Sequence, residues 1–474
     1  MTMERDFDVV VMGAGPAGEV LAGRLSERGG KQVAIVERDL VGGECSFYAC
    51  MPSKALLRPA ELLREVARVP GAAQAVTREL DVAAVLARRD EIVNNLDDAH
   101  QVPWLTARNI ELVRGDARLD GERRVRVGDD VLIARDAVVI AVGTGALIPP
   151  IPGLAGVGAW SNREITTARE VPERLVVLGG GVVGVEMAQA WASLGSRVTV
   201  IEAMDRLVAR EEPFVGEQLR EALEQAGVTV HTGVRASTVS RDGDEITVTL
   251  ENGESVTGDR LLVAIGRKPL TDGLGLETVG LLASGYIEVD EHLCVIGAPG
   301  LYAIGDVNGR SLLTHSGKYQ ARIAADHILG EPAAAITDGP GAPRVIFTDP
   351  QIAAVGVTLD AALRDGIAVE PFDLPTEGTA GGSFYGHGAA GTTRFVVDVE
   401  REVLVGATFV GPEVADFLQA ATIAIVAEVP LATLAHAIAP FPTRSELWLK
   451  FIEAYETDCG TTLHAQGLPS GVSA

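Results

Sequence analysis

The sequence predicts an α/β protein with two Rossmann-like, three-layer nucleotide-binding domains and a C-terminal α+β domain. Two observations lead to this fold class. A strand, a glycine-rich turn, a helix and a second strand occur in the same order twice, and the last third of the chain mixes strands and helices without that pattern. At 474 residues the chain is too long for one ordinary core, and 47% hydrophobic residues suit a globular protein.

The first nucleotide-binding pattern lies at the N-terminus. An apolar, β-branched run leads into a turn that carries Gly13, Gly15 and Gly18, a helical segment follows, and the next strand ends at Glu37. Such glycines permit a tight turn and a close approach of the backbone to a pyrophosphate, while the acidic residue binds ribose hydroxyls. We therefore expect a dinucleotide at this turn.

The second pattern carries Gly179, Gly181 and Gly184, and its second strand ends at Glu202. Two such units predict two dinucleotides, and the pair that exchanges hydride is typically a flavin and a nicotinamide, so we expect FAD and NADH. Glu202 can bind free ribose hydroxyls but would repel a 2′-phosphate, which favours NADH over NADPH. The alternative is a duplicated domain in which one site is inactive.

Two further strand-plus-glycine segments, 137–153 and 260–270, are typical of chain crossovers between nucleotide domains. They contain three expected cofactor-binding residues, Gly143, Gly266 and Arg267. Asp306 follows a short buried strand and precedes a helical stretch, so it is well placed to bind a sugar-like hydroxyl chain.

The charge of the chain argues against a nucleic-acid or membrane partner. The formal net charge is −25, whereas phosphates need clustered lysines and arginines to neutralise them. We identify no membrane-spanning stretch and no targeting signature at the N-terminus, so we expect a cytoplasmic protein.

Of the four cysteines, Cys45 and Cys50 are the informative pair because they are close in sequence. Four intervening residues can form about one helical turn, which can bring two sulfurs within bonding distance and place Cys50 near a helix N-terminus, where the dipole favours a thiolate. The alternatives are two unlinked core cysteines or half of a metal site. No second His or Cys cluster has ligand spacing, so we expect no metal.

Taken together, these motifs resemble the pyridine nucleotide-disulfide oxidoreductases, the class that contains dihydrolipoamide dehydrogenase, glutathione reductase and mercuric reductase. The resemblance covers nearly the whole chain in the order GAGPAG, GGECSFYACMPSK, AVGTGALIPPIPG, LGGGVVGVE, IGRKPL, GDV, TDPQIAAVG and PTRSE. It implies an FAD-binding domain in two parts, 1–150 and 271–336, an NAD-binding domain, 151–270, and an interface or dimerisation domain, 337–474. It also implies a homodimer whose active sites take residues from both subunits.

The resemblance gives roles to individual residues. Cys45 would be the interchange thiol that meets the substrate, and Cys50 the charge-transfer thiol against the flavin. Lys54 would lie on the flavin side, with Glu186 as its partner near the nicotinamide. The helix that begins near His315 would place its N-terminus beside the flavin ring and stabilise negative charge there.

One position departs from the family pattern. Disulfide reductases of this class carry a histidine before Pro-Thr-x-Ser-Glu, and this imidazole, oriented by the glutamate, is the general base for the interchange thiol. In this chain Phe441 stands at that place while Glu446 is kept. A benzyl side chain neither accepts nor donates a proton, so the base is missing.

Several functions are compatible with this departure. The chain could still be an NADH-dependent reductase that passes electrons through FAD and the dithiol to a small-molecule acceptor, such as a disulfide with an acidic leaving thiol. It could be a diaphorase or NADH:quinone reductase. It also resembles the 2-ketopropyl coenzyme M oxidoreductase/carboxylase branch, which has phenylalanine at this place but histidine where this chain has Glu446.

Two other functions fit fewer features. A mercuric reductase would carry adjacent cysteines in its C-terminal tail, where this chain has only Cys459. A flavin-binding structural or sensor protein would require that NADH not reduce the flavin. The sequence leaves the roles of His387 and Arg444 open, with contact to an anionic acceptor as one hypothesis for Arg444.

Overall fold

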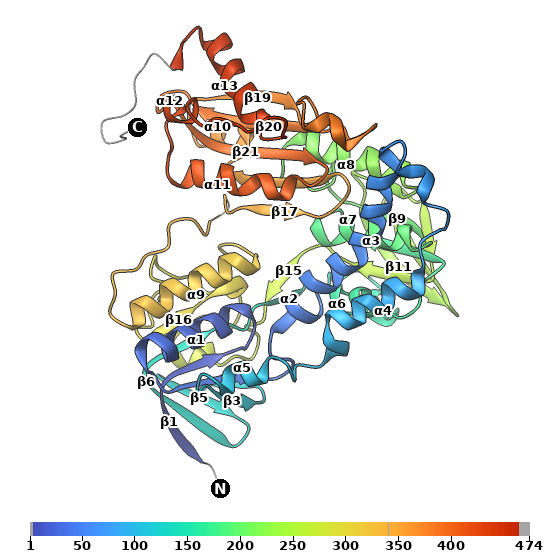
Figure 1. Ribbon diagram of the computed structural model, residues 1–474. Coiled ribbons are helices and arrows are strands. Elements are labelled where there is room, and N and C mark those ends of the chain that lie inside the picture. Colours follow the sequence, from blue (N-terminus) through green and yellow to red (C-terminus); the bar gives the residue numbers. More distant parts are fainter. Residues whose placement is uncertain (1–2, 340, 464–474) are drawn as a thin grey trace.

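The computed structural model describes residues 3–339 and 341–463 of the chain. In Figure 1 one unit combines blue and yellow segments, a second is mostly green, and a third is orange to red. Two of these units contain parallel strands flanked by helices, although β4 (Ala117–Leu119) and β5 (Arg124–Val127) of the first unit pair antiparallel, and the third is built on an antiparallel sheet. The predicted α/β class with two nucleotide-binding units and a C-terminal α+β unit is confirmed.

The first unit is built on a seven-stranded sheet. Its strands are β1 (Glu4–Met12), β2 (Val33–Glu37), β3 (Glu111–Arg114), β4 (Ala117–Leu119), β5 (Arg124–Val127), β6 (Asp130–Ile140) and β16 (Leu301–Ala303). The order is β3-β2-β1-β6-β5-β4, and β16 pairs in parallel with β6. The chain therefore leaves this sheet, forms the second unit and returns.

Both faces of this sheet are buried, as expected for parallel strands between layers of other elements. Alternate residues of β1 enter two separate cores, with Val9 on one face and Val10 on the other. The Val9 core includes residues of α1 (Pro16–Gly29) and α9 (Thr314–Ile328), which pack against each other. The first and the last helix of this unit are thus neighbours (Figure 1).

The second unit contains a parallel sheet of order β10-β9-β8-β14 and an antiparallel sheet of order β11-β12-β13. Its strands are β8 (Arg174–Leu178), β9 (Arg197–Ile201), β10 (Thr229–His231), β11 (Ala236–Asp242), β12 (Glu245–Leu250), β13 (Ser255–Gly258) and β14 (Arg260–Val263). Its helices include α6 (Asn162–Thr167), α7 (Val182–Ser193) and α8 (Pro213–Gln225). Two short strands, β7 (Thr144–Ala146) and β15 (Arg267–Pro269), pair where the chain enters and leaves this unit.

Two consecutive helices connect the first unit to the others. They are α2 (Gly43–Phe47) and α3 (Cys50–Arg68). Leu56 and Leu57 of α3 share a core with α7. Arg64 and Arg68 bind the buried carboxylate of Asp349, which lies between strands β17 (Arg344–Ile346) and β18 (Gln351–Gly356) of the third unit. Two more helices of this region, α4 (Val82–Ile92) and α5 (Val102–Thr106), complete the segment before β3.

The third unit is an antiparallel sheet of order β17-β18-β21-β20-β19. Its strands are β17 (Arg344–Ile346), β18 (Gln351–Gly356), β19 (Val369–Pro375), β20 (Thr392–Asp398) and β21 (Val403–Gly411), and its helices are α10 (Leu359–Arg364), α11 (Leu418–Val426), α12 (Leu431–Leu434) and α13 (Glu446–Cys459). Phe395, Phe409 and Phe451 lie at its core.

In the described part of the chain, no helix combines the length and the hydropathy that a membrane span needs. Residues 464–474, the end of the C-terminal tail, lie outside the described residues. For these residues, the statement that the tail has no adjacent cysteines rests on the sequence alone.

Candidate active site

The two glycine turns have matching geometries. Gly13 and Gly179 adopt φ values of 108° and 107°, in the left-handed region that favours glycine. Gly15 and Gly181 are the N-caps of α1 and α7. A Cβ built on either of these two glycines would have no described atom within 4 Å, so the backbone at each helix N-terminus is open to a ligand. Such an N-terminus, with a free approach to its backbone amides, suits a pyrophosphate.

The two acidic residues at the strand ends are held in the same way. The carboxylate of Glu37 accepts hydrogen bonds from the backbone N–H groups of Ala14 and Asp39, both at 2.8 Å. Glu202 accepts from the N–H groups of Gly180 and Met204. Each carboxylate is therefore fixed beside its own glycine turn, in the position from which an acid binds ribose hydroxyls.

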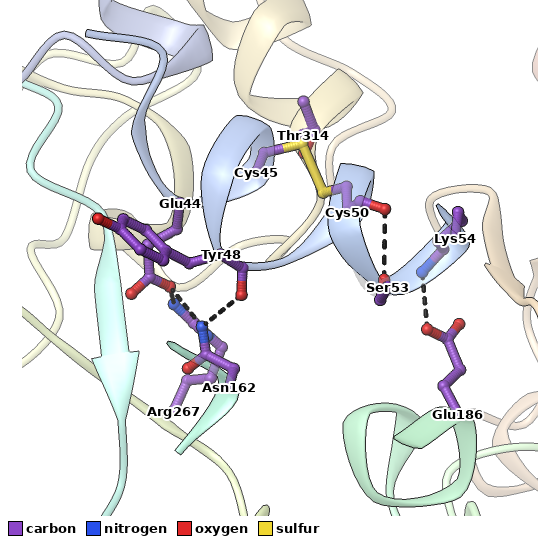
Figure 2. Close-up of a disulfide and its surroundings, with 10 residues drawn as sticks. All are labelled: Glu44, Cys45, Tyr48, Cys50, Ser53, Lys54, Asn162, Glu186, Arg267 and Thr314. Carbon is purple, nitrogen blue, oxygen red and sulfur yellow. Dashed lines mark hydrogen bonds and ion pairs between the residues drawn. A yellow bond between two sulfur atoms is a disulfide. The ribbon is translucent and has the colours of Figure 1, made fainter. Parts of the chain in front are cut away.

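Cys45 and Cys50 are joined in a disulfide between two helices (Figure 2). Cys45 lies in α2 and Cys50 is the first residue of α3, because the non-helical backbone of Ala49 separates the helices. Their Cα atoms are 4.7 Å apart. The hydroxyl of Thr314, the first residue of α9, lies 3.0 Å from the sulfur of Cys45 and 3.4 Å from that of Cys50.

The predicted partners Lys54 and Glu186 form an ion pair of 2.7 Å, one helical turn along α3 from Cys50 (Figure 2). The side chain of Glu186 is only 4% exposed, and its second oxygen accepts a hydrogen bond from the backbone N–H of Phe347 at 2.9 Å. The ammonium group of Lys54 also lies 4.8 Å from the centre of the Phe347 ring. These contacts fix a positive charge close to the cysteine pair.

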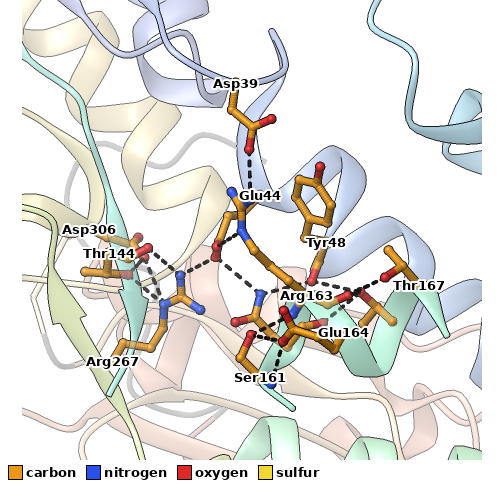
Figure 3. Close-up of polar contacts among 12 residues, drawn as sticks. Asp39, Glu44, Tyr48, Thr144, Ser161, Arg163, Glu164, Thr167, Arg267 and Asp306 are labelled. Atoms are coloured by element: carbon orange, nitrogen blue, oxygen red, sulfur yellow. Dashed lines mark hydrogen bonds and ion pairs between the residues drawn. The ribbon is translucent and has the colours of Figure 1, made fainter. Parts of the chain in front are cut away.

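Arg267 joins a polar network that contains Asp306 (Figure 3). Its guanidinium donates to the hydroxyl of Thr144 at 2.6 Å and to the carboxylate of Glu44, and it lies 3.9 Å from a carboxylate oxygen of Asp306. Thr144 in turn donates to Asp306 at 2.8 Å. Burial raises the pKa of the Asp306 carboxyl group, while Thr144 and Arg267 oppose this rise.

Glu44, next to Cys45 in sequence, is a site residue that sequence reasoning missed. Besides Arg267, it binds Arg163 of α6 at 3.1 Å (Figure 3) and the amide of Asn162 at 3.4 Å (Figure 2). Asn162 also donates to the backbone oxygen of Tyr48, at 3.0 Å, within the loop between the cysteines. The only signal in the sequence was the acidic residue itself, because its arginine partners come from distant segments.

The remaining predicted positions are spread over these elements. Gly143 and Gly266 adopt φ values of 72° and 146° just before β7 and β15. Gly18 and Gly184 each pack against the carbonyl group of the first glycine of their turn, which leaves no room for a side chain. His315 is exposed in the first turn of α9.

The C-terminal motif lies in the third unit. Phe441 is 77% exposed, and Glu446 accepts a hydrogen bond from the backbone N–H of Gly381 at 3.2 Å. Within the described residues, no hydrogen bond or ion pair joins either side chain to the cysteine pair of the same chain. The structure therefore brings together the cysteines, Lys54 and Glu186, but not the C-terminal motif.

Arg444, for which contact with an anion was one hypothesis, is 6% exposed. Its guanidinium donates to the backbone oxygen of Pro412 and lies between the rings of Tyr385 and Phe417, 4.6 and 4.8 Å from their centres. These contacts make it part of the packing of the third unit. The backbone N–H of His387 bonds the carbonyl of Arg68 at 3.0 Å, which anchors the loop before β20 to the end of α3.

No group of three or more His, Cys, Asp or Glu residues in the described ranges could hold a metal ion. The free Cys459 is exposed near the end of α13.

Comparisons with known proteins agree with this geometry. The model of the family described as "Pyridine nucleotide-disulphide oxidoreductase" matches residues 7–325, and the model of the dimerisation domain of the same family matches residues 342–451. A dihydrolipoyl dehydrogenase of Thermus scotoductus is 34% identical over 459 residues, which cover 95% of this chain and 97% of that protein. A mercuric reductase of Acidithiobacillus ferrooxidans is 33% identical and covers 93% of this chain and 81% of its own length.

A solved structure gives the same result in three dimensions. The HOCl-induced flavoprotein disulfide reductase RclA from Escherichia coli superposes with a TM-score of 0.82 at 26% sequence identity. The match covers 94% of this chain and 99% of that structure.

Proposed function

Because the chain belongs to the pyridine nucleotide-disulphide oxidoreductase family, we propose that it passes electrons from NADH through FAD to the Cys45–Cys50 disulfide and on to a small-molecule acceptor. Family membership makes it a flavoprotein disulfide oxidoreductase. The observation that carries the proposal is the presence, in one chain, of two matching glycine turns with fixed acids and a disulfide at the N-terminus of α3.

FAD fits the first unit. The open backbone at Gly15 would receive its pyrophosphate, Glu37 would bind its ribose hydroxyls, and Asp306 with Thr144 would bind its hydroxyl chain. When bound, FAD supplies a carrier that takes up hydride and gives electrons to sulfur. The chain's own part is to hold Cys50 at the positive end of α3, where the helix dipole favours its thiolate.

NADH is the proposed donor because the carboxylate of Glu202 would repel the 2′-phosphate of NADPH. Wild-type protein should reduce its flavin faster with NADH than with NADPH at equal concentration. Glu202→Ala should lower this preference by about tenfold or more, since one lost charged hydrogen bond costs about 1.5–3 kcal/mol. Asp205→Ala is the matched control, because this neighbouring acid is 80% exposed. A wild-type preference for NADPH would contradict the proposal, and stopped-flow flavin reduction measures it.

The cysteine pair is proposed to carry the electrons. Anaerobic titration with NADH should produce a long-wavelength absorbance band between the Cys50 thiolate and oxidised FAD. Cys50→Ser should abolish this band and lower turnover with disulfides to background, while NADH still bleaches the flavin. A reduced spectrum that is the same in the variant would remove the dithiol from the electron path.

The proposed acceptor is one that needs no imidazole base, such as a disulfide with an acidic leaving thiol. A quinone is the second candidate, because Phe441 offers no proton and transfer from flavin or dithiol to a quinone needs no thiol base. A screen of lipoamide, glutathione-type disulfides, quinones and mercuric ion with NADH separates these classes. A lipoamide rate equal to the best quinone rate would contradict the idea that Phe441 restricts the acceptor.

The dimerisation domain supports a further part of the proposal, a homodimer in which each site uses both subunits. Phe441 is exposed in the single chain, so it is free to enter the site of a second subunit.

A further inference from the structure

The hydroxyl group of Thr314 touches both reactive sulfurs. It lies 3.0 Å from the sulfur of Cys45 and 3.4 Å from that of Cys50, and Figure 2 shows it beside the disulfide. Among the residues that the structure describes, no other side chain is within hydrogen-bond distance of either sulfur. Sequence reasoning missed this residue, because it is far from the cysteines in sequence.

Once the disulfide is reduced, the cysteine pair needs a group that can exchange a proton with its sulfurs. Two electrons and one proton break the S–S bond and leave one thiol and one thiolate. Cys45 must be the thiolate to attack an acceptor, whereas the N-terminus of α3 favours the thiolate of Cys50. Phe441 cannot take the proton from Cys45, so the proton needs another path.

We propose that the Thr314 hydroxyl is the proton partner of the reduced cysteine pair. It accepts the proton of the Cys45 thiol while its own proton passes to the Cys50 thiolate. The products are a Cys45 thiolate, a Cys50 thiol and a restored hydroxyl, so the net change is the transfer of one proton from Cys45 to Cys50, and no electron is transferred in this step. The inference rests on the proposed function, which supplies the two electrons from NADH.

The chemistry of a hydroxyl group suits the role of proton partner. It donates one hydrogen bond and accepts up to two, so it can bind a thiolate and a thiol at the same time. Thr314 is also the first residue of α9, a helix of 15 residues, and the positive end of its dipole favours negative charge on either sulfur.

The charged groups on the surrounding helices are already paired or lie on other faces. Glu44 of α2 is bound by Arg163 and Arg267, and Lys54 of α3 is bound by Glu186 of α7. The other titratable groups in the first turns of α9 are His315, which is exposed, and Lys318, whose charge lowers the pKa of Glu19. None of these described groups bonds a sulfur, so Thr314 is the direct partner.

The test measures the acidity of Cys45 without NADH. The purified flavoprotein is reduced with a phosphine, and alkylation of Cys45 by iodoacetamide is followed against pH by peptide mass spectrometry. Thr314→Val should raise the pH midpoint of alkylation by about one unit and slow alkylation at neutral pH about tenfold, because a charge-assisted hydrogen bond to the thiolate is lost. Thr314→Ser keeps the hydroxyl and should behave like the wild type.

Two further variants make the test decisive. Thr314→Ala removes the same hydroxyl with a smaller side chain, and it replaces the valine variant if that protein does not fold. Ser53→Ala is the matched control, because this hydroxyl bonds the backbone oxygen of Cys50 and not a sulfur. An unchanged midpoint in Thr314→Val or Thr314→Ala, or a serine variant as slow as they are, would overturn the inference.

The result separates this inference from the proposed function. Reduction of the flavin by NADH is measured in the same proteins by stopped flow. A wild type that NADH does not reduce would contradict the proposed function, while the alkylation profiles would still decide the role of Thr314.

Discussion

Phe441 stands where the family resemblance leads us to expect the histidine that is the general base for the interchange thiol. The Phe441 ring is 77% exposed in the single chain. Among the described residues, Glu446, the residue that would orient an imidazole, accepts a hydrogen bond only from the backbone N–H of Gly381, through one oxygen. The second carboxylate oxygen is therefore available to orient a histidine placed at position 441.

We expect Phe441→His to raise NADH-dependent turnover of a model disulfide. A positioned general base contributes about 10²- to 10⁴-fold, so a gain of about 10² in steady-state rate is expected. Phe384→His is the matched control, because Phe384 is also exposed in the third unit, at 67%. No gain in Phe441→His, or an equal gain in the control, would mean that the acceptor site excludes disulfides for another reason, such as access.

At the scale of elements, a partly buried carboxyl group lies on α1, the helix that packs against α9. Glu19 lies in the first turn of α1, and desolvation raises its pKa from 4.5 to about 7. Lys318 of α9 opposes this rise and Glu37 adds to it. Between these two pH values the folded protein holds a proton that the unfolded chain has released.

The consequence is a loss of stability as pH rises. The native state binds more protons than the unfolded state from pH 4.5 to about 7, so the free energy of unfolding falls over this range, by roughly 3 kcal/mol at most. Glu19→Gln should remove this fall in the free energy of unfolding. The variant should be more stable than the wild type by a small amount at pH 4.5 and by the largest amount above pH 7. Urea unfolding at pH 5 and pH 8 measures it. Glu27→Gln, an exposed position on the same helix, should leave the wild-type slope unchanged, and an unchanged slope in Glu19→Gln would contradict the burial argument.

Local patterns in the sequence predicted the two glycine turns, their acids and the fold class, because each signal lies within one strand-turn-helix-strand segment. Family motifs located the Lys54–Glu186 pair, whose two residues are distant in sequence. The Thr314 contact and the arginine partners of Glu44 could not be predicted in this way. They depend on β16 returning to the first sheet and on the pairing of β7 with β15, and no local period encodes these contacts.

At the scale of the whole molecule, the third unit exposes large apolar side chains on and near its helices. They are Ile423, Val426, Ile438, Phe441 and Leu449, and Ile438 is 94% exposed. Exposed apolar groups are costly in water, and a contiguous patch of them is typical of a protein–protein interface. The dimerisation-domain match over residues 342–451 makes a second copy of the chain the proposed partner.

Ile438→Asp tests this assembly, because a carboxylate in an apolar interface cannot be solvated or paired. We expect the wild type to sediment as two chains of 49.6 kDa and the variant to shift toward one chain at micromolar concentration. If the sites are shared, acceptor turnover should fall as the dimer dissociates, whereas reduction of the flavin by NADH should persist, since both glycine turns lie within one chain.

Leu282→Asp places the same charge at another exposed apolar position, which is 86% exposed and lies outside the third unit, and this variant should remain dimeric and active. Full acceptor turnover in a monomeric Ile438→Asp protein would show that one chain holds a complete site, and the proposal that each site uses both subunits would then be wrong.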